Sequence, residues 1–279
     1  MLLKKFLSIF SLLILISACS STSYKIDNKT YQAKSKNSRI RYIIVHYTAI
    51  NDEKSINALT KNNVSSHYLI TTKAKDPIYS LVPDLERAWH AGDSTFGKRT
   101  NLNDSSIGIE IVNVGMRPAK SKYNNGNPDY IIPRERYIPF NPVQIDKVAF
   151  LIRQLSEKYE IAPENILGHS DIAPGRKQDP GPLFPWEFLY RSHGLGSWYD
   201  QKDFNKYYNW SLYDSYSIKA IKAEFKKFGY DMNDTNEWDT PSRKVLYAFQ
   251  MHYRPKKLTG EMDLETFAII KALNKKYKK

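Results

Sequence analysis

Short apolar runs recur along the first two thirds of the chain. They are RYIIVHYTA (41–49), SSHYLITT (65–72), IYSLV (78–82), SSIGIEIVN (105–113) and ENILG (164–168). Each is short and most are rich in β-branched or aromatic residues, a composition typical of strands that are largely buried. Five strands are therefore predicted before residue 170.

A helix is predicted between the fourth and fifth of these runs. Asn141 and Pro142 form a good helix start, because Asn caps free backbone N–H groups and Pro is favoured at the first helical position. Spacings of three and four residues then place one apolar stripe on a helix: Ile145, Val148, Ile152, Leu155 and Tyr159. Strands that alternate with helices predict an α/β domain over residues 38–195, with a long surface loop at 114–140.

The last third has a different pattern. Residues 196–214 are rich in Tyr, Asn and Asp without strand-like runs, and we expect a connector there. Helical patterns follow at 217–228, 241–252 and 263–276. They predict a small, separate three-helix bundle over residues 215–279.

The amino end has the pattern of an export signal. Lys4 and Lys5 precede an apolar run, residues 6–16, which is too short to span a bilayer. ISAC then leads into Cys19, the single cysteine, and resembles the lipidation motif of bacterial lipoproteins. We expect a signal peptide at 1–18, lipidation of Cys19, and a polar tether at 19–37; an ordinary signal peptide followed by a free thiol is the alternative. Ser20 follows the cysteine, and the resemblance to enterobacterial lipoproteins then implies the outer membrane.

The chain is basic, with a formal net charge of +13 that falls to +11 once Lys4 and Lys5 are removed with the signal peptide. A basic surface favours anionic partners such as acidic lipid, nucleic acid or an anionic wall polymer. The positive charge is spread along the chain and no nucleic-acid-binding motif is present, so we expect no nucleic-acid partner.

One stretch, LGHSDIAPGRKQDPGP (167–182), concentrates ionisable groups between prolines and glycines. Its composition predicts a stiff, shaped loop. Its His169 and Asp179, together with His46 at the end of the first predicted strand, could supply the three protein ligands of a catalytic metal. Spacing alone does not decide this, because a histidine beside a strand is more often a hydrogen-bonded core residue, and Asp171 is a rival carboxylate.

The motifs VHYTA, SSHYLI, AWHAG, SIGIEI and GHSDIAPGRKQDPGPLFPW occur in an order that resembles the zinc-dependent N-acetylmuramoyl-L-alanine amidases of type 2. The resemblance runs nearly from end to end, and the last motif is highly specific. It implies a central mixed β-sheet flanked by helices, with hydrolysis of the amide between N-acetylmuramic acid and L-alanine in peptidoglycan or muropeptides. The C-terminal helices resemble a peptidoglycan-binding module, with a purely structural cap as the alternative.

The same resemblance implies roles for individual residues. The zinc ligands would be His46, His169 and Asp179. Glu110 would be the catalytic carboxylate, assisted by Lys177. Trp89 and His90 are expected to line the substrate cleft, whereas Asp171 and Arg176 fall to supporting or surface roles.

The alternatives to a monomeric outer-membrane amidase are a non-catalytic peptidoglycan-recognition protein on the same fold and a structural lipoprotein that ties wall to membrane. The first typically lacks one of the three ligands, and this chain has them all.

Overall fold

The structure is a computed structural model that describes residues 25–118 and 131–278. The chain divides into two units, residues 1–37 and 38–279. Within the first unit, residues 25–37 are exposed and form neither helix nor strand. The predicted signal peptide and Cys19 lie outside the described residues. No helix within the described ranges has the length and apolar content needed to cross a bilayer.

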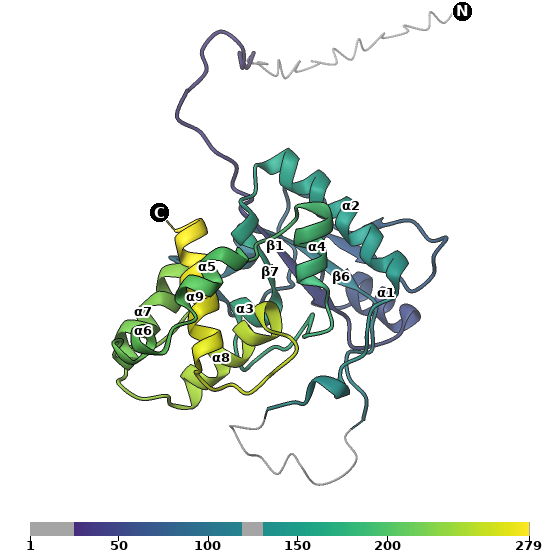
Figure 1. Cartoon of the computed structure of the whole chain (residues 1–279). Coiled ribbons are helices and arrows are strands. Elements are labelled where there is room, and N and C mark those ends of the chain that lie inside the picture. The colour runs from purple at the N-terminus through teal and green to yellow at the C-terminus, as the bar shows by residue number, and fades with distance from the viewer. Residues whose placement is uncertain (1–24, 119–130, 279) are drawn as a thin grey trace, which may run out of the picture. The chain divides into compact units, whose positions relative to one another are not determined.

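A five-stranded mixed sheet forms the centre of the second unit (Figure 1). Its order is β3-β2-β6-β1-β7, and only the β2–β3 pair is antiparallel. The bounds are β1 (Tyr42–Tyr47), β2 (Tyr68–Ile70), β3 (Tyr79–Ser80), β6 (Ser106–Ile111) and β7 (Ile166–Gly168). All five predicted strands are confirmed. A separate small hairpin joins β4 (Thr95–Phe96) to β5 (Arg99–Thr100).

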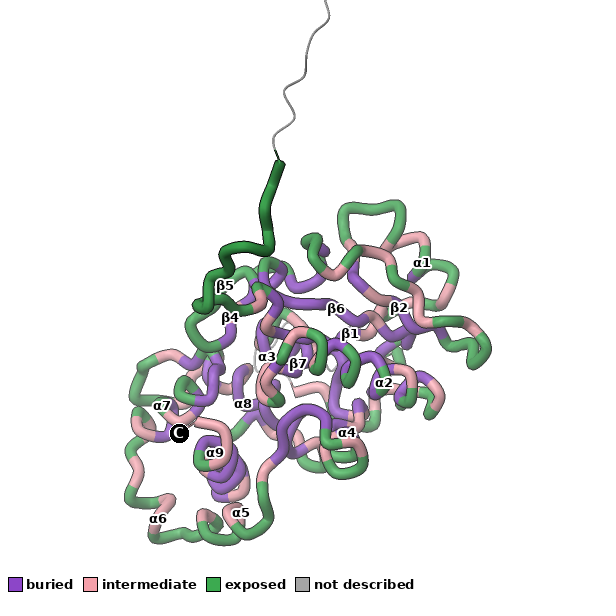
Figure 2. The backbone as a smooth tube through the Cα atoms, turned by 90° about the horizontal axis from the view of Figure 1, so that it is seen from above, coloured by how far each residue is buried: buried purple, intermediate pink, exposed green. Residues whose placement is uncertain are grey.

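The central strands are buried over most of their length, as Figure 2 shows for β1 and β6. Parallel strands are normally covered on both faces. One covering element is the predicted helix, α2 (Pro142–Tyr159), whose apolar stripe belongs to the main core. Asn141 caps it, and the side chain of Gln144 completes a capping box. The prediction of this helix and its start is confirmed.

Three further helices surround the sheet, and none was predicted. They are α1 (Asp52–Lys61), α3 (His169–Ile172) and α4 (Trp186–His193). Helix α1 buries only Ser55 fully, and its sequence accordingly has almost no apolar stripe by which it could be predicted. Helix α3 is a single turn inside the stretch predicted to be a shaped loop. Single-turn 3-10 helices lie at Leu102–Asp104, Arg134–Arg136 and Pro163–Asn165.

The regular elements of the C-terminal third are all helices within the described residues. The three predicted helices are present as α7 (Ile218–Phe228), α8 (Thr240–Tyr253) and α9 (Leu264–Tyr277). The expected connector also holds two short helices, α5 (Gln201–Tyr207) and α6 (Trp210–Asp214). Helices α5 and α7 both pack on α9.

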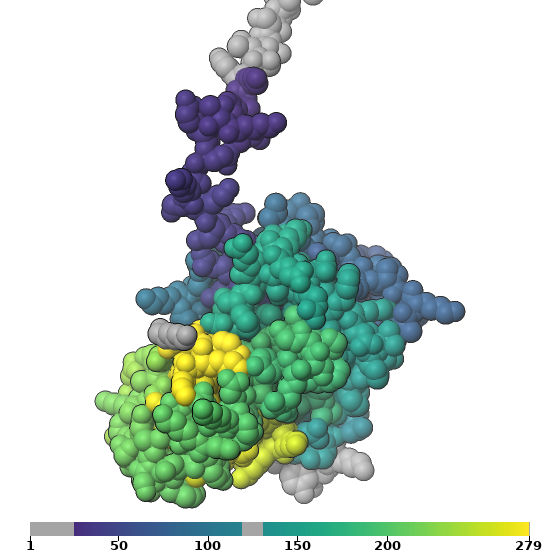
Figure 3. All heavy atoms as spheres, turned by 45° about the horizontal axis from the view of Figure 1, so that its top comes forward, coloured from purple at the N-terminus to yellow at the C-terminus, as the bar shows by residue number. Residues whose placement is uncertain are grey.

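The C-terminal helices are not an independent bundle, because one hydrophobic core runs through them and the α/β part. The ring of Phe96, in the β4–β5 hairpin, lies 5.6 Å from that of Tyr230 and 6.4 Å from that of Phe228. On the face shown in Figure 3, the green and yellow atoms of these helices directly adjoin the teal atoms of the α/β part. Residues 38–279 accordingly form one compact unit.

The shared core predicts that residues 38–279 unfold together. Phe96→Ala removes a ring that is 2% exposed and should lower the free energy of unfolding by about 3–5 kcal/mol. Phe150→Ala, on the exposed face of α2, is the matched control and should change it by less than about 0.5 kcal/mol. Urea denaturation followed by tryptophan fluorescence and circular dichroism measures both. Two separated transitions, with Phe96→Ala affecting only one, would contradict the shared core.

Candidate active site

The sheet brings His46 and Glu110 together. They are direct partners in the parallel register of β1 and β6, and each lies one residue before the end of its strand. Paired residues of adjacent parallel strands point to the same face. The carboxyl edge of such a sheet is also where ligands bind in α/β folds. The two side chains therefore share one face at the edge of the sheet suited to a site.

The stretch after β7 brings two more side chains to His46. Its Nδ1 atom lies 2.9 Å from Nδ1 of His169 and 2.9 Å from Oδ2 of Asp179, and the last two atoms are 3.0 Å apart. The Ser170 N–H donates to the Asp179 carbonyl at 2.9 Å, which ties the two ends of the stretch together. The three predicted ligands form a buried His-His-Asp cluster that could hold a metal ion.

Hydrogen bonds behind the cluster select the imidazole tautomers. His169 Nε2 lies 3.0 Å from the Ala91 carbonyl, which can only accept, so Nε2 carries the proton and Nδ1 presents its lone pair. His46 Nε2 lies 3.0 Å from Nδ1 of His90. When His46 donates there, its own Nδ1 is also unprotonated. Two lone pairs and a carboxylate oxygen then face one another, which suits a cation at their centre.

The surroundings of His46 and Asp179 favour the protonation states that metal ligands need. Burial and the neighbouring His169 lower the pKa of His46 to about 4, so its imidazole is neutral at pH 7. Burial alone would raise the pKa of Asp179, but its interactions with His169 and His46, which include a hydrogen bond to each, outweigh burial and hold that pKa well below its usual range. A neutral imidazole and an ionised carboxylate are forms that coordinate metals.

Glu110 has one carboxylate oxygen, Oε2, that is buried without a hydrogen-bond partner among the described residues. Burial raises the pKa of Glu110 to about 8; the charge of Asp179 adds to this rise, and that of Lys177 opposes it. A carboxyl group with a pKa near neutrality can both accept and return a proton. Lys177 is half-buried and close enough for its charge to act on Glu110 and on His46.

The cluster opens into a cleft of about 420 Å³. All the predicted site residues of the catalytic part contribute to its lining. The others include Tyr47, Thr48, Leu59, Val64, Ser65, Met116, Arg176 and Gln178. Polar, apolar and ionisable groups thus meet in one place, as small-molecule sites require.

Comparison with known proteins identifies the family. A model of the N-acetylmuramoyl-L-alanine amidase family matches residues 36–182. N-acetylmuramoyl-L-alanine amidase AmiD of Escherichia coli K12 is 37% identical over 99% of both chains. The chain belongs to the N-acetylmuramoyl-L-alanine amidase family.

Solved amidase structures share the fold over nearly the whole chain. AmpDh3 from Pseudomonas aeruginosa has a TM-score of 0.80 at 36% identity, and the match covers 92% of this chain and 100% of that one. E. coli AmiD in complex with the substrate anhydro-N-acetylmuramic acid-L-Ala-D-γ-Glu-L-Lys has a TM-score of 0.77 at 38% identity, over 91% and 95%. The mixed sheet with flanking helices is thus the amidase fold.

The two residues predicted to line the amidase cleft differ in their surroundings. Trp89 is 54% exposed, and the Arg87 guanidinium lies 4.1 Å from its ring centroid. His90 is buried behind His46, and its Nε2 lies 3.3 Å from Ser106 Oγ, which in turn donates to the Leu102 carbonyl. Gly108 makes room for this ring, since a Cβ there would lie 2.5 Å from it. Substrate contact by either residue stays a prediction.

Three contacts around the ligands escaped the sequence reasoning. Arg176, expected in a supporting or surface role, is exposed and also donates to the Ala91 carbonyl at 2.7 Å, the same oxygen that His169 contacts. Ser106 completes the hydrogen-bond chain behind His46. Asp171, the rival candidate ligand, is buried, and its carboxylate accepts hydrogen bonds from residues outside the cluster. Backbone acceptors and contacts between distant segments leave no motif in the sequence.

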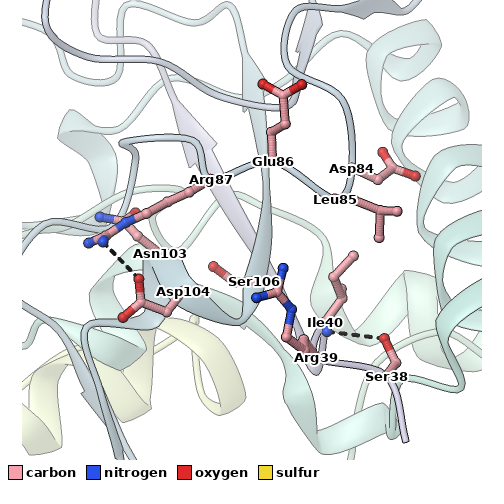
Figure 4. Close-up of a pocket in the computed structure, with 10 residues that line it drawn as sticks. All are labelled: Ser38, Arg39, Ile40, Asp84, Leu85, Glu86, Arg87, Asn103, Asp104 and Ser106. Carbon is pink, nitrogen blue, oxygen red and sulfur yellow. Dashed lines mark hydrogen bonds and ion pairs between the residues drawn. The ribbon is translucent and has the colours of Figure 1, made fainter. Parts of the chain in front are cut away.

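A second cavity of similar size, about 430 Å³, lies at the end of β6 that is away from Glu110 (Figure 4). Ser106, the first residue of that strand, lines it together with Arg87 and Asp104. Arg87 and Asp104 pair with each other at 2.9 Å. None of the predicted site residues lines this cavity. The first cleft, which the predicted residues of the catalytic part line, is therefore the candidate active site.

The convergence of three ligands predicts how metal content depends on them. His46→Ala removes one of three donors and should reduce bound metal from about one ion per chain to near zero, because two donors rarely hold a catalytic metal. His193→Ala, at the end of α4 outside the cleft, is the matched control and should keep the full content. Inductively coupled plasma mass spectrometry of the dialysed proteins measures the metal content of both variants. Equal metal contents in the two variants would exclude this cluster as the metal site.

Proposed function

We propose that this amidase is zinc-dependent and uses the His-His-Asp cluster to hold the ion. Two imidazoles and one carboxylate form a donor set that zinc takes in catalytic sites, with a fourth position left for water or substrate. The observation that carries the proposal is the convergence of His46, His169 and Asp179 on one point, beside the unpartnered carboxylate oxygen of Glu110. When bound, zinc supplies a Lewis acid that polarises the scissile carbonyl and makes water more acidic.

The side chains around the cluster move and stabilise charge. Glu110 takes a proton from the attacking water and returns it to the leaving nitrogen of L-alanine as the C–N bond breaks, so that the amide and one water become a carboxylate and a protonated amine. Its raised pKa suits both steps. Lys177 places positive charge beside the oxyanion that develops on the carbonyl, an effect often worth about 3 kcal/mol.

We propose muropeptides with a 1,6-anhydro sugar as one substrate class. AmiD of E. coli and AmpDh3 of P. aeruginosa have both been solved with anhydromuramyl peptides bound, and both match this chain over more than nine-tenths of its length. The exposed indole of Trp89 offers a flat apolar face at the edge of the cleft for a sugar ring or a peptide side chain.

The proposed amidase reaction predicts a clear difference between two glutamate variants. Glu110→Gln removes the proton acceptor and should reduce kcat about 10²–10⁴-fold while zinc remains bound. Glu86→Gln changes an exposed glutamate outside the cleft and should act like the wild type. Peptidoglycan and anhydro-muropeptides are digested with each protein in zinc, and the products are identified by mass.

Free stem peptides beginning with L-alanine are the expected product. Their absence with the zinc-loaded wild type would overturn the catalytic proposal. Muropeptide binding without hydrolysis would instead indicate a recognition protein.

We further propose how the chain is organised and anchored. Residues 1–18 are a lipoprotein signal, lipidated Cys19 holds the protein at the outer membrane facing the periplasm, and residues 19–37 are the tether. Residues 38–195 carry the amidase site, 196–214 the connection, and 215–279 a peptidoglycan-binding function. The supporting observations are the ISAC motif with its apolar leader and the exposed, irregular backbone of residues 25–37. We expect a monomer.

Lipidation predicts that Cys19→Ser changes where the protein is found. Several acyl chains anchor a protein stably, so the wild type should sediment with outer membranes and the variant should be released or retained as an unprocessed precursor. Ser23→Ala, elsewhere in the proposed tether, is the control. Membrane fractionation followed by intact-mass analysis tests this. A wild type recovered without an acyl mass increment would contradict the anchor.

A further inference from the structure

Asp171 is among the most enclosed carboxylates of the described residues, with 1% of its surface exposed. It lies in the single turn of α3, two residues after His169. Three donors surround it: the Gly168 N–H at 2.8 Å, Nδ1 of His252 at 2.7 Å and the hydroxyl of Tyr230 at 2.6 Å. A buried carboxylate is costly unless it is hydrogen-bonded, so these contacts hold the turn in place.

Both side-chain donors come from the C-terminal third. They lie about 60 and 80 positions after Asp171 in the chain. Tyr230 follows α7, and His252 is near the end of α8, which packs beside α3 (Figure 1). The His252 ring is stacked between Trp186, at 4.1 Å, and Tyr253, at 4.0 Å between centroids. This packing holds the ring in place, and Nδ1 donates to Asp171 because an ionised carboxylate can only accept.

A second contact joins α8 to the other end of the same stretch. Tyr247 of α8 and Tyr137 share a hydrogen bond between their hydroxyls at 2.8 Å. The Tyr137 ring lies against Gly181, where a Cβ would come within 2.7 Å of it. Gly181 has φ +78°, a conformation that favours glycine. Helix α8 thus supports the segment 168–181 at both of its ends.

The segment needs this support because it has little structure of its own. One helical turn is not stable alone, since forming its first hydrogen bonds orders several residues for little gain. The direction of the His169 ring depends on the backbone of that turn, and the Ser170 N–H is tied to Asp179. A shift of α3 would therefore move two of the three cluster residues together.

We propose that Asp171, Tyr230 and His252 are positioning residues that hold His169 and Asp179 in the geometry for the metal. The C-terminal helices then complete the metal site, in addition to any contact they make with peptidoglycan. This inference rests on the proposed use of the His-His-Asp cluster for zinc.

The test measures zinc affinity of the full chain by competition with a chromogenic chelator. Tyr230→Phe keeps the ring and removes only one donor, so it should fold. His252→Leu removes the other donor, and His252→Asn restores a side-chain N–H near the same place. Residues that orient metal ligands typically contribute about 10–100-fold to affinity. We expect a loss of that size in Tyr230→Phe and His252→Leu, with partial recovery in His252→Asn.

Asn274→Ala is the matched control. Asn274 is buried in α9 and bonds to Glu224 of α7, so its loss destabilises the C-terminal helices without touching the segment 168–181. Its zinc affinity should equal that of the wild type. If Tyr230→Phe and His252→Leu also bind zinc as tightly as the wild type, this inference alone is overturned. If the wild type binds no zinc, the metal site fails and the inference fails with it.

Discussion

The structure depends on three donor atoms that face one another within 3.0 Å. Two of them are lone pairs on buried imidazoles and the third is a carboxylate oxygen. They come from a central strand and from both ends of a segment that follows an edge strand of the same sheet. Such atoms do not stay together through their own attraction, because desolvation opposes every charged form. The surrounding fold has to hold them there, and a cation bound between them would offset the repulsion among the three donor atoms.

Much of the fold holds these three donor atoms together. The parallel register of β1 and β6 fixes His46 beside Glu110. The Ala91 carbonyl fixes the tautomer of His169, and His90 contacts Nε2 of His46 from behind. The short segment after β7 is held by its own cross-links and by α8. Positioning is the larger part of what a hydrolytic site must supply. The C-terminal helices are therefore best understood as part of the enzyme's frame, whatever else they bind.

The sequence predicted the elements that are strongly periodic and the three motif residues that the structure brings into one cluster. The apolar stripe of α2 and its start at Asn141 could be predicted because both depend only on residues close together in the sequence. His46 could be placed at the end of a strand for the same reason. Helix α1 was missed because it is mostly solvated, and α3 because one turn has no period. The shared core and the role of Asp171 depend on contacts with residues such as His252, far along the chain, which no local pattern records.

X-ray absorption at the zinc edge tests the central claim most directly, because it reports the atoms around the ion itself. For the protein loaded with one zinc per chain, we predict four nitrogen or oxygen neighbours at about 2.0–2.1 Å with the outer-shell scattering of two imidazoles. His169→Ala should lose one imidazole contribution. A sulfur neighbour, a fully hydrated ion, or a spectrum unchanged by that substitution would contradict the account.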